Sequence, residues 1–203
     1  MLFIGITGGV GAGKTEILNH IKDNWCSRIM LADEIAHDVM TPDGRCYGQL
    51  RELFGDDDVW QEDGSFDRKK LASVLFSNDA KRAREDAIVH PAVKEVVREE
   101  YAREKELARV DLLVLEAALL IEEKYDEICG ELWYIYTSEE NRRERLKASR
   151  GYSDAKVDSI FKTQLSEETF RAHCAEVIDN NGTRKDTFFQ VDALMEKKGI
   201  RPR

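Results

Sequence analysis

The sequence lacks the features that mark membrane-spanning, secreted and metal-cluster proteins. No apolar run approaches the ~20 residues that a membrane-spanning helix needs. The chain enters an apolar stretch almost at its first residue, so we expect no signal peptide. Its four cysteines, Cys26, Cys46, Cys129 and Cys174, are far apart and form no C-x-x-C pair. We therefore expect free thiols in or near the core, with a zinc site as a remote alternative.

Positive charge is also scarce. The chain has 31 Lys and Arg against 40 Asp and Glu, which gives a net charge of −9 at pH 7. A protein that coats nucleic acid needs the opposite balance, because it must neutralise phosphates. We therefore expect neither a nucleic-acid nor a membrane partner. With 203 residues, 42% of them hydrophobic and 35% charged, the chain is expected to form one soluble, cytoplasmic domain.

One stretch near the N-terminus carries most of the information. It fits the pattern G-x-x-x-x-G-K-[ST] and reads Gly8-Gly9-Val10-Gly11-Ala12-Gly13-Lys14-Thr15. The apolar run before it, 2–7, is predicted to be a buried parallel strand, and the run after it, 16–21, can be helical. Strand, glycine loop and helix together are the context of a phosphate-binding loop, which a chance Gly-rich turn would lack.

The residue types of this loop suit a nucleoside triphosphate. Glycines let the backbone wrap around a phosphate without a Cβ in the way. The amides of residues 8–13 and the start of the helix then point at the anion. Lys14 is expected to reach the β- and γ-phosphates, and Thr15 to hold Mg²⁺ through its hydroxyl.

Two acidic residues are predicted to lie at the carboxyl ends of strands, where ligands bind in open α/β sheets. Asp33 ends the predicted second strand, 27–33, and is either a general base or a ligand of Mg²⁺-bound water, or else the N-cap of the helix that follows. Glu116 ends the third strand, 110–116, and could serve Mg²⁺. Two further strands are predicted over 132–137 and 176–179.

Residues 41–109 form a long excursion without a clear strand. Helices are predicted to begin after Asp67 and after Asn78, and His90-Pro91 is predicted to end the second and start a third. An insertion of this length usually carries substrate recognition. His90 taken alone favours a buried structural histidine.

A basic helix is predicted after the fourth strand, with Ser138 as its cap. Its cations could simply be a solvated face. They stand out against an acidic chain, however, and follow a strand end that should face the phosphates. They favour a mobile lid whose arginines offset phosphoryl charge; its basic residues are Arg142, Arg143, Arg145, Lys147 and Arg150.

Together these stretches resemble the dephospho-CoA kinase family, a branch of the P-loop kinases related to nucleoside monophosphate kinases. The resemblance follows the chain in order, through residues 4–15, 32–36, 63–71, Phe76, His90-Pro91, 119–122 and 177–180. It implies an α/β fold of the P-loop NTPase type, a three-layer α/β/α arrangement with a five-stranded parallel sheet. The single domain would comprise a core (1–33, 110–137, 175–203), a helical substrate-binding region (34–109) and a helical lid (138–174).

The resemblance also implies a reaction and its residues. ATP, with Mg²⁺, would phosphorylate the ribose 3′-hydroxyl of dephospho-CoA to give CoA. Asp33, Lys14, Arg145 and Arg150 would be catalytic, with Asp33 taking the proton from the hydroxyl. Asp33, His90 and Glu116 would contact the substrate, although Glu116 could serve the metal instead. Asn180 would lie near the adenine, while the oligomeric state stays open.

The sequence departs from the family pattern at several positions. Leu31 replaces the first Asp of Asp-Ala-Asp, and the segment from Glu116 lacks the usual Pro. The lid motif Arg-Asp-Gly reads Ser149-Arg150-Gly151, so the lid arginine is absent or displaced by one position. Two alternatives therefore stay open. One is a kinase of this fold that acts on another nucleotide or small-molecule hydroxyl; the other is an ATP-binding paralogue without transfer activity.

Overall fold

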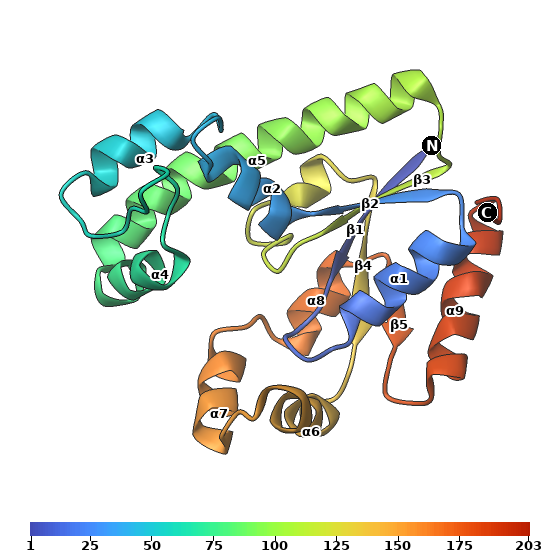
Figure 1. Cartoon of the computed structure of the whole chain (residues 1–203). Coiled ribbons are helices and arrows are strands. Elements are labelled where there is room, and N and C mark those ends of the chain that lie inside the picture. Colours follow the sequence, from blue (N-terminus) through green and yellow to red (C-terminus); the bar gives the residue numbers. More distant parts are fainter. The chain divides into compact units, whose positions relative to one another are not determined.

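A parallel sheet forms the centre of the fold in the computed structural model, which describes residues 1–203 (Figure 1). β1 is central and pairs in parallel with β3 and β4, and β4 pairs in parallel with β5. The carboxyl ends of these strands therefore share one edge. The predicted α/β fold with a five-stranded parallel sheet is confirmed. The strand order is β2 (Ser27–Leu31), β3 (Leu112–Glu116), β1 (Leu2–Thr7), β4 (Glu131–Tyr136) and β5 (Glu176–Asp179).

The central strands form where the sequence is continuously apolar, as buried parallel strands require. Every residue from Leu112 to Leu115 is fully buried, and so are Ile4 and Ile6 of β1. The predicted second strand is shorter than expected because β2 ends at Leu31. Asp33 is therefore not at a strand end; it lies in the first turn of the helix that follows.

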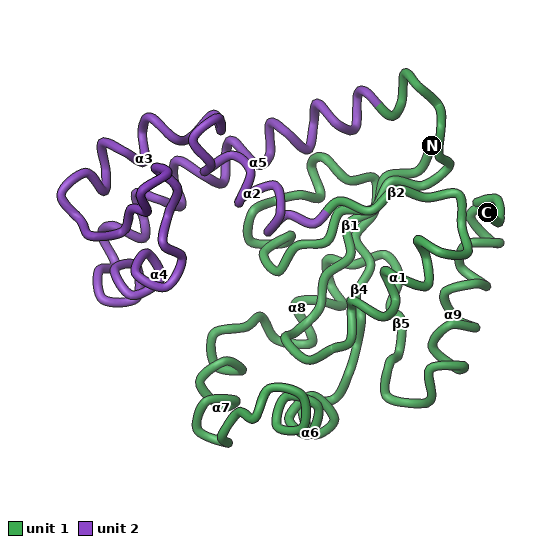
Figure 2. Tube along the Cα trace, viewed as in Figure 1, with its two compact units in different colours: residues 1–30, 104–203 green, residues 31–103 purple.

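The chain divides into two compact units, coloured separately in Figure 2. The first comprises residues 1–30 and 104–203 and contains the sheet apart from Leu31. Ser138 and Ser153 cap their helices as predicted, accepting from the amides of Asn141 and Lys156. Its complete helices are α1 (Lys14–Asn24), a 3₁₀ turn (Tyr125–Glu127), α6 (Glu139–Arg150), α7 (Asp154–Lys162), α8 (Glu167–His173) and α9 (Arg184–Lys197).

The second unit, residues 31–103, is helical. It contains α2 (Ala32–Met40), α3 (Tyr47–Phe54), α4 (Arg68–Ser77) and most of α5 (Asp79–Leu107). Asp67 caps α4 as predicted, accepting from the amides of Lys69 and Lys70. Aromatic rings fill the core of this unit: Phe66 lies 4.1 Å from Trp60 and 5.9 Å from Phe54 between ring centroids.

The predicted break at His90-Pro91 is wrong, because α5 is one helix of 29 residues with Pro91 inside it. Proline removes one backbone donor and crowds the preceding turn, which usually kinks or ends a helix. Here Val89, Val93 and Val97 recur every fourth residue and are almost completely buried. Burial of this stripe carries the helix through the proline.

The two units correspond only in part to the three regions expected from the sequence. The expected substrate-binding region, 34–109, overlaps the second unit, and the expected lid, 138–174, groups with the core in the first. The three-region division stays a prediction. All four cysteines are free thiols, as predicted, and Cys46 and Cys129 are buried. No helix is both long enough and apolar enough to cross a membrane.

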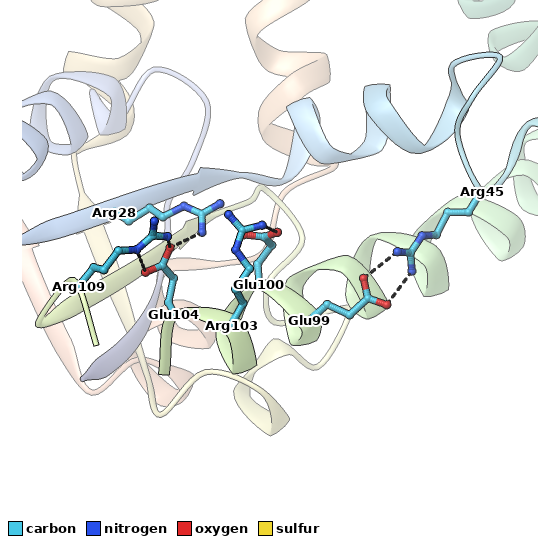
Figure 3. Close-up of polar contacts among 7 residues, drawn as sticks. All are labelled: Arg28, Arg45, Glu99, Glu100, Arg103, Glu104 and Arg109. Atoms are coloured by element: carbon cyan, nitrogen blue, oxygen red, sulfur yellow. Dashed lines mark hydrogen bonds and ion pairs between the residues drawn. The ribbon is translucent and has the colours of Figure 1, made fainter. Parts of the chain in front are cut away.

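Buried and exposed ion pairs occur along the same helix (Figure 3). The Glu104 side chain is 1% exposed, and both Arg28, at 2.7 Å, and Arg109 donate to its Oε1. The hydrogen bond from Arg109 is the main reason that the pKa of Glu104 lies below its usual value. Glu99 accepts two hydrogen bonds from Arg45, but its side chain is 55% exposed.

This contrast gives a stability prediction. Glu104→Gln should lower the free energy of unfolding by about 1–3 kcal/mol, since it removes charge-assisted bonds from a buried site. Glu99→Gln, the matched exposed variant, should cost less than about 1 kcal/mol. Urea unfolding measures both. Because the pKa of Glu104 is lowered by folding, its contribution is present above about pH 4.3 and is lost as the pH falls through the folded value. Equal losses at neutral pH would contradict the role of burial.

Candidate active site

The loop between β1 and α1 has the backbone shape of an anion-binding site. Gly11 and Gly13 have φ values of 85° and 87°, in the left-handed region that glycine favours. A Cβ on Gly11 would lie 3.0 Å from Leu146 Cγ, and one on Gly13 would collide with the Asn180 side chain. Gly13 is the N-cap of α1, so the first amides of this helix are available to an anion.

Lys14 and Glu116 meet at the start of the loop. The Lys14 ammonium donates to the Gly8 carbonyl at 2.9 Å and lies 3.4 Å from a carboxylate oxygen of Glu116. Glu116 is the last residue of β3 and pairs in register with Ile6, so it reaches the loop from the neighbouring strand, as predicted. Thr15 is exposed in the first turn of α1. A cation, a carboxylate and a hydroxyl are thus gathered around one loop.

Three donors converge on the carbonyl of Ala12 and hold the loop in shape. The Asn180 amide donates to it at 2.7 Å, Thr137 Oγ1 at 3.0 Å and Arg145 Nη1 at 3.4 Å. Arg145 Nη2 also donates to the Asn180 carbonyl at 2.7 Å. The oxygen of the Asn180 amide accepts from Thr187 at 2.9 Å. Asn180 and Arg145 therefore brace the loop, and their contacts with adenine or phosphate stay predictions.

Arg142 also contacts the loop, although in the sequence it is only one of several basic residues of this helix. Its Nε donates to the Val10 carbonyl at 2.9 Å, and its Nη2 donates to the side-chain oxygen of Gln164. The guanidinium carbon lies 4.3 Å from the ring centroid of Phe161. Arg142 is 9% exposed, and this burial lowers the pKa of its guanidinium.

Helical spacing explains which arginines of α6 reach the loop. At about 100° per residue, Arg142 and Arg145 lie about 60° apart on one face, whereas Arg150 lies about 140° from Arg145. Arg150 is exposed at the end of α6, 5.9 Å from the ring of Tyr152. This spacing was the signal in the sequence that could have identified Arg142. A catalytic role for Arg150 stays a prediction.

The other cations of α6 bind a neighbouring helix. Arg143 donates to Asp154 and Asp158 at 3.2 and 2.6 Å, and Lys147 donates to Asp154 at 2.9 Å. These carboxylates belong to α7. The basic helix is therefore neither wholly a solvated face nor wholly directed at the loop.

The second unit has a cavity of about 1140 Å³ with Asp33 on its wall. Leu31 is the N-cap of α2, so the interpretation of Asp33 as an N-cap is wrong. Arg68 and Lys69 also line the cavity, as do the apolar side chains of Phe66, Leu71 and Leu75. The cavity thus combines a carboxylate, cations and an apolar wall.

His90 lies outside the lining of this cavity, with Nε2 3.4 Å from Asp86 one turn earlier in α5. Its predicted contact with substrate stays a prediction. Glu85, beside Asp86, does line the cavity. Burial, and then the charge of Asp86, raise the pKa of Glu85 to about 7. A lone Glu in a helix gives no sequence signal, so this residue could not be identified from the sequence.

Comparison with known proteins identifies the family. A family model described as Dephospho-CoA kinase matches residues 2–186. The chain belongs to the dephospho-CoA kinase family. Among curated relatives, the dephospho-CoA kinase of Bacillus anthracis is 33% identical over 200 residues and covers 97% of both chains. That of Carboxydothermus hydrogenoformans is 32% identical over 194 residues, covering 96% of this chain and 93% of the relative. The resemblance seen in the sequence is confirmed.

Solved structures share the fold of this chain. TT1252 from Thermus thermophilus matches with a TM-score of 0.77 and 26% identity, over 97% of each chain. The dephospho-CoA kinase from Campylobacter jejuni matches with a TM-score of 0.70 over 97% of each chain. Its identity of 20% supports the fold alone.

The brace at Ala12 gives a prediction about nucleotide binding. Asn180→Asp removes the shortest of the three hydrogen bonds to the Ala12 carbonyl and places a carboxylate, which cannot donate, against that oxygen. ATP affinity should therefore fall about tenfold, the scale of losing one buried hydrogen bond. Isothermal titration with ATP measures this. Asn181→Asp is the control, because its Oδ1 can still accept from the Ser138 amide and its lost bond to Asp179 is exposed. Equal ATP affinities in the two variants would exclude the brace.

The raised pKa of Glu85 gives a prediction about pH. The folded chain keeps a proton on this carboxyl that the unfolded chain has already lost, so the associated stability is full below about pH 4 and is lost as the pH rises through 7. The free energy of unfolding of Glu85→Gln, taken relative to that of the wild type, should therefore increase from about pH 5 to about pH 8. Urea titrations at both pH values check this, with exposed Glu52→Gln as the variant that should follow the wild type.

Proposed function

We propose that this chain transfers the γ-phosphoryl group of ATP to the ribose 3′-hydroxyl of dephospho-CoA, giving CoA and ADP. The observation that carries the proposal is the membership of nearly the whole chain in the dephospho-CoA kinase family, together with the intact loop from Gly8 to Thr15. ATP is the phosphoryl donor that the kinase family implies.

On the donor side, the loop amides and Lys14 would bind the phosphates. The fit to Mg²⁺ rests on the donor set, because Thr15 and Glu116 supply oxygens near the loop. No group of three or more His, Cys, Asp or Glu gathers as a protein cage. Mg²⁺ commonly keeps several waters and uses few protein oxygens besides phosphates. When bound, it would neutralise charge on the phosphate oxygens.

On the acceptor side, Asp33 would accept the proton of the 3′-hydroxyl. The hydroxyl oxygen forms its bond to the γ-phosphorus as the bond from that phosphorus to the bridging oxygen breaks, and ADP leaves. Arg68 and Lys69 would bind the phosphates of the acceptor, and the apolar wall would contact its less polar arm. The cavity volume of about 1140 Å³ suits an acceptor of this size.

Several finer expectations belong to the same proposal. His90 would contact the substrate and Arg150 would act in the lid. ATP and dephospho-CoA would be the small-molecule partners, with no nucleic acid or membrane involved, and the protein would work in the cytoplasm. The altered lid sequence Ser149-Arg150-Gly151 favours a second candidate, a kinase of the same fold with a different hydroxyl acceptor.

The decisive experiment measures ADP formation from Mg²⁺-ATP with and without dephospho-CoA, using the purified full chain. Dephospho-CoA should stimulate ADP release strongly, and mass spectrometry should detect CoA in equal amount. Release that depends on another nucleotide or alcohol in an acceptor panel would support the second candidate. Nucleotide binding without turnover on any acceptor would contradict both.

Asp33 gives a kinetic prediction. Asp33→Asn should lower kcat by about 10² or more, the scale of losing a general base. Asp38→Asn is the matched control, because Asp38 lines the same cavity and its replacement removes the same charge. The control should keep kcat within about threefold, a loss below 1 kcal/mol in the barrier. Near-normal turnover of Asp33→Asn would remove Asp33 from this role.

A further inference from the structure

Gly9 has a steric constraint that the phosphate-loop motif does not require. It occupies a variable position of G-x-x-x-x-G-K-[ST], and its backbone does not adopt the left-handed conformation. Yet a Cβ on Gly9 would lie only 2.6 Å from Nη1 and 2.5 Å from Nη2 of Arg142. The guanidinium of Arg142 therefore lies directly against the Cα of Gly9.

The direction of the Lys14 side chain indicates which end of the loop faces the terminal phosphate. Lys14 belongs to α1, and its ammonium returns to the Gly8 carbonyl at 2.9 Å. The lysine of such loops reaches the β- and γ-phosphates. The terminal phosphate of a bound triphosphate is therefore expected beside Gly8 and Gly9, where Arg142 lies. Arg145 instead contacts the Ala12 end, next to the start of the helix.

The charge of Arg142 is only partly offset within the protein, by Glu139 one turn earlier in α6. Its Nε and Nη2 donate to neutral oxygens, and none of its hydrogen bonds uses Nη1. Arg143 and Lys147, on the same helix, are paired with carboxylates, whereas Arg142 forms no ion pair. A largely buried cation without an anion in direct contact is costly, and a bound phosphate would reduce this cost.

We propose that Arg142 binds the terminal phosphate of ATP and neutralises its charge during transfer. The kinetic part of this inference rests on the proposed function, while the binding part needs only the loop. As the acceptor oxygen bonds to the γ-phosphorus and the bridging bond breaks, the proton goes to Asp33 and Arg142 keeps all of its own protons. Ser149 stands where the lid motif of the family has an arginine. It lies about two turns from Arg142 on the same face of α6, so Arg142 supplies a guanidinium to this face from an earlier turn.

Nucleotide binding tests the inference without an acceptor. Isothermal titration with Mg²⁺ compares ADP with a β,γ-imido analogue of ATP. Arg142→Ala should weaken binding of the analogue at least tenfold and that of ADP less than threefold, because only the analogue has a third phosphate. The control, Arg143→Ala, removes a bond between α6 and α7 and should leave the ratio of the two affinities unchanged. An equal loss for both nucleotides in Arg142→Ala, or no loss, would overturn the inference.

A double-mutant cycle tests the contact with Gly9. Gly9→Ala should displace the guanidinium and lower kcat by about 10²-fold, as much as Arg142→Ala, since lost electrostatic stabilisation is of this order. Because the three atoms nearest to the added methyl group all belong to the Arg142 guanidinium, Gly9→Ala should have little further effect in the Arg142→Ala background. Additive losses would contradict the inference, and thermal unfolding of each variant checks that it folds.

The binding and kinetic experiments together distinguish a failure of this inference from a failure of the proposed function. If the wild type shows no ADP release with dephospho-CoA, the proposed acceptor is wrong, yet the ratio of ATP-analogue to ADP affinity still tests Arg142. If transfer proceeds normally in Arg142→Ala, the reaction stands and the role of Arg142 fails. Arg142→Lys, which keeps the charge but loses the planar fork, should recover part of the affinity for the analogue.

Discussion

The phosphate loop depends on the carbonyl of Ala12, where donors from three distant segments meet. Thr137 follows β4, Arg145 lies on α6 and Asn180 follows β5. They can meet because β1, β4 and β5 are parallel neighbours whose carboxyl ends share one edge. The loop therefore depends on the order of the strands as well as on its own glycines. A loop with the same sequence in another sheet order would lack these partners.

The acidic composition raises the question of how the chain attracts a triphosphate. In the structure, the cations of α6 contact different partners. Arg142 and Arg145 face the loop with Lys14, while Arg143 and Lys147 are offset by carboxylates of α7. Net charge describes the whole surface and is a weak guide to a site, because a few oriented donors at short range dominate the local potential.

Features set by short-range chemistry were predictable from the sequence. The loop, the apolar strands and the caps at Asp67, Ser138 and Ser153 follow from a few neighbouring residues each, and the family follows from motifs in order. Features set by packing were not. Proline predicts an end to α5, but burial of Val89, Val93 and Val97 overrides it. Arg142 looked equivalent to the other basic residues of its helix until the fold brought Val10 and Gln164 to it.

The thiols of buried Cys129 and half-buried Cys174 have a consequence for an enzyme whose acceptor ends in a thiol, as dephospho-CoA does. Burial raises the pKa of Cys129 and Cys174 to about 12. At neutral pH such thiols are almost entirely protonated, and the thiolate is the form that attacks a disulfide. These two cysteines would thus resist forming mixed disulfides with oxidised CoA. Their packing therefore protects these two thiols from disulfides of the enzyme's own class of metabolite.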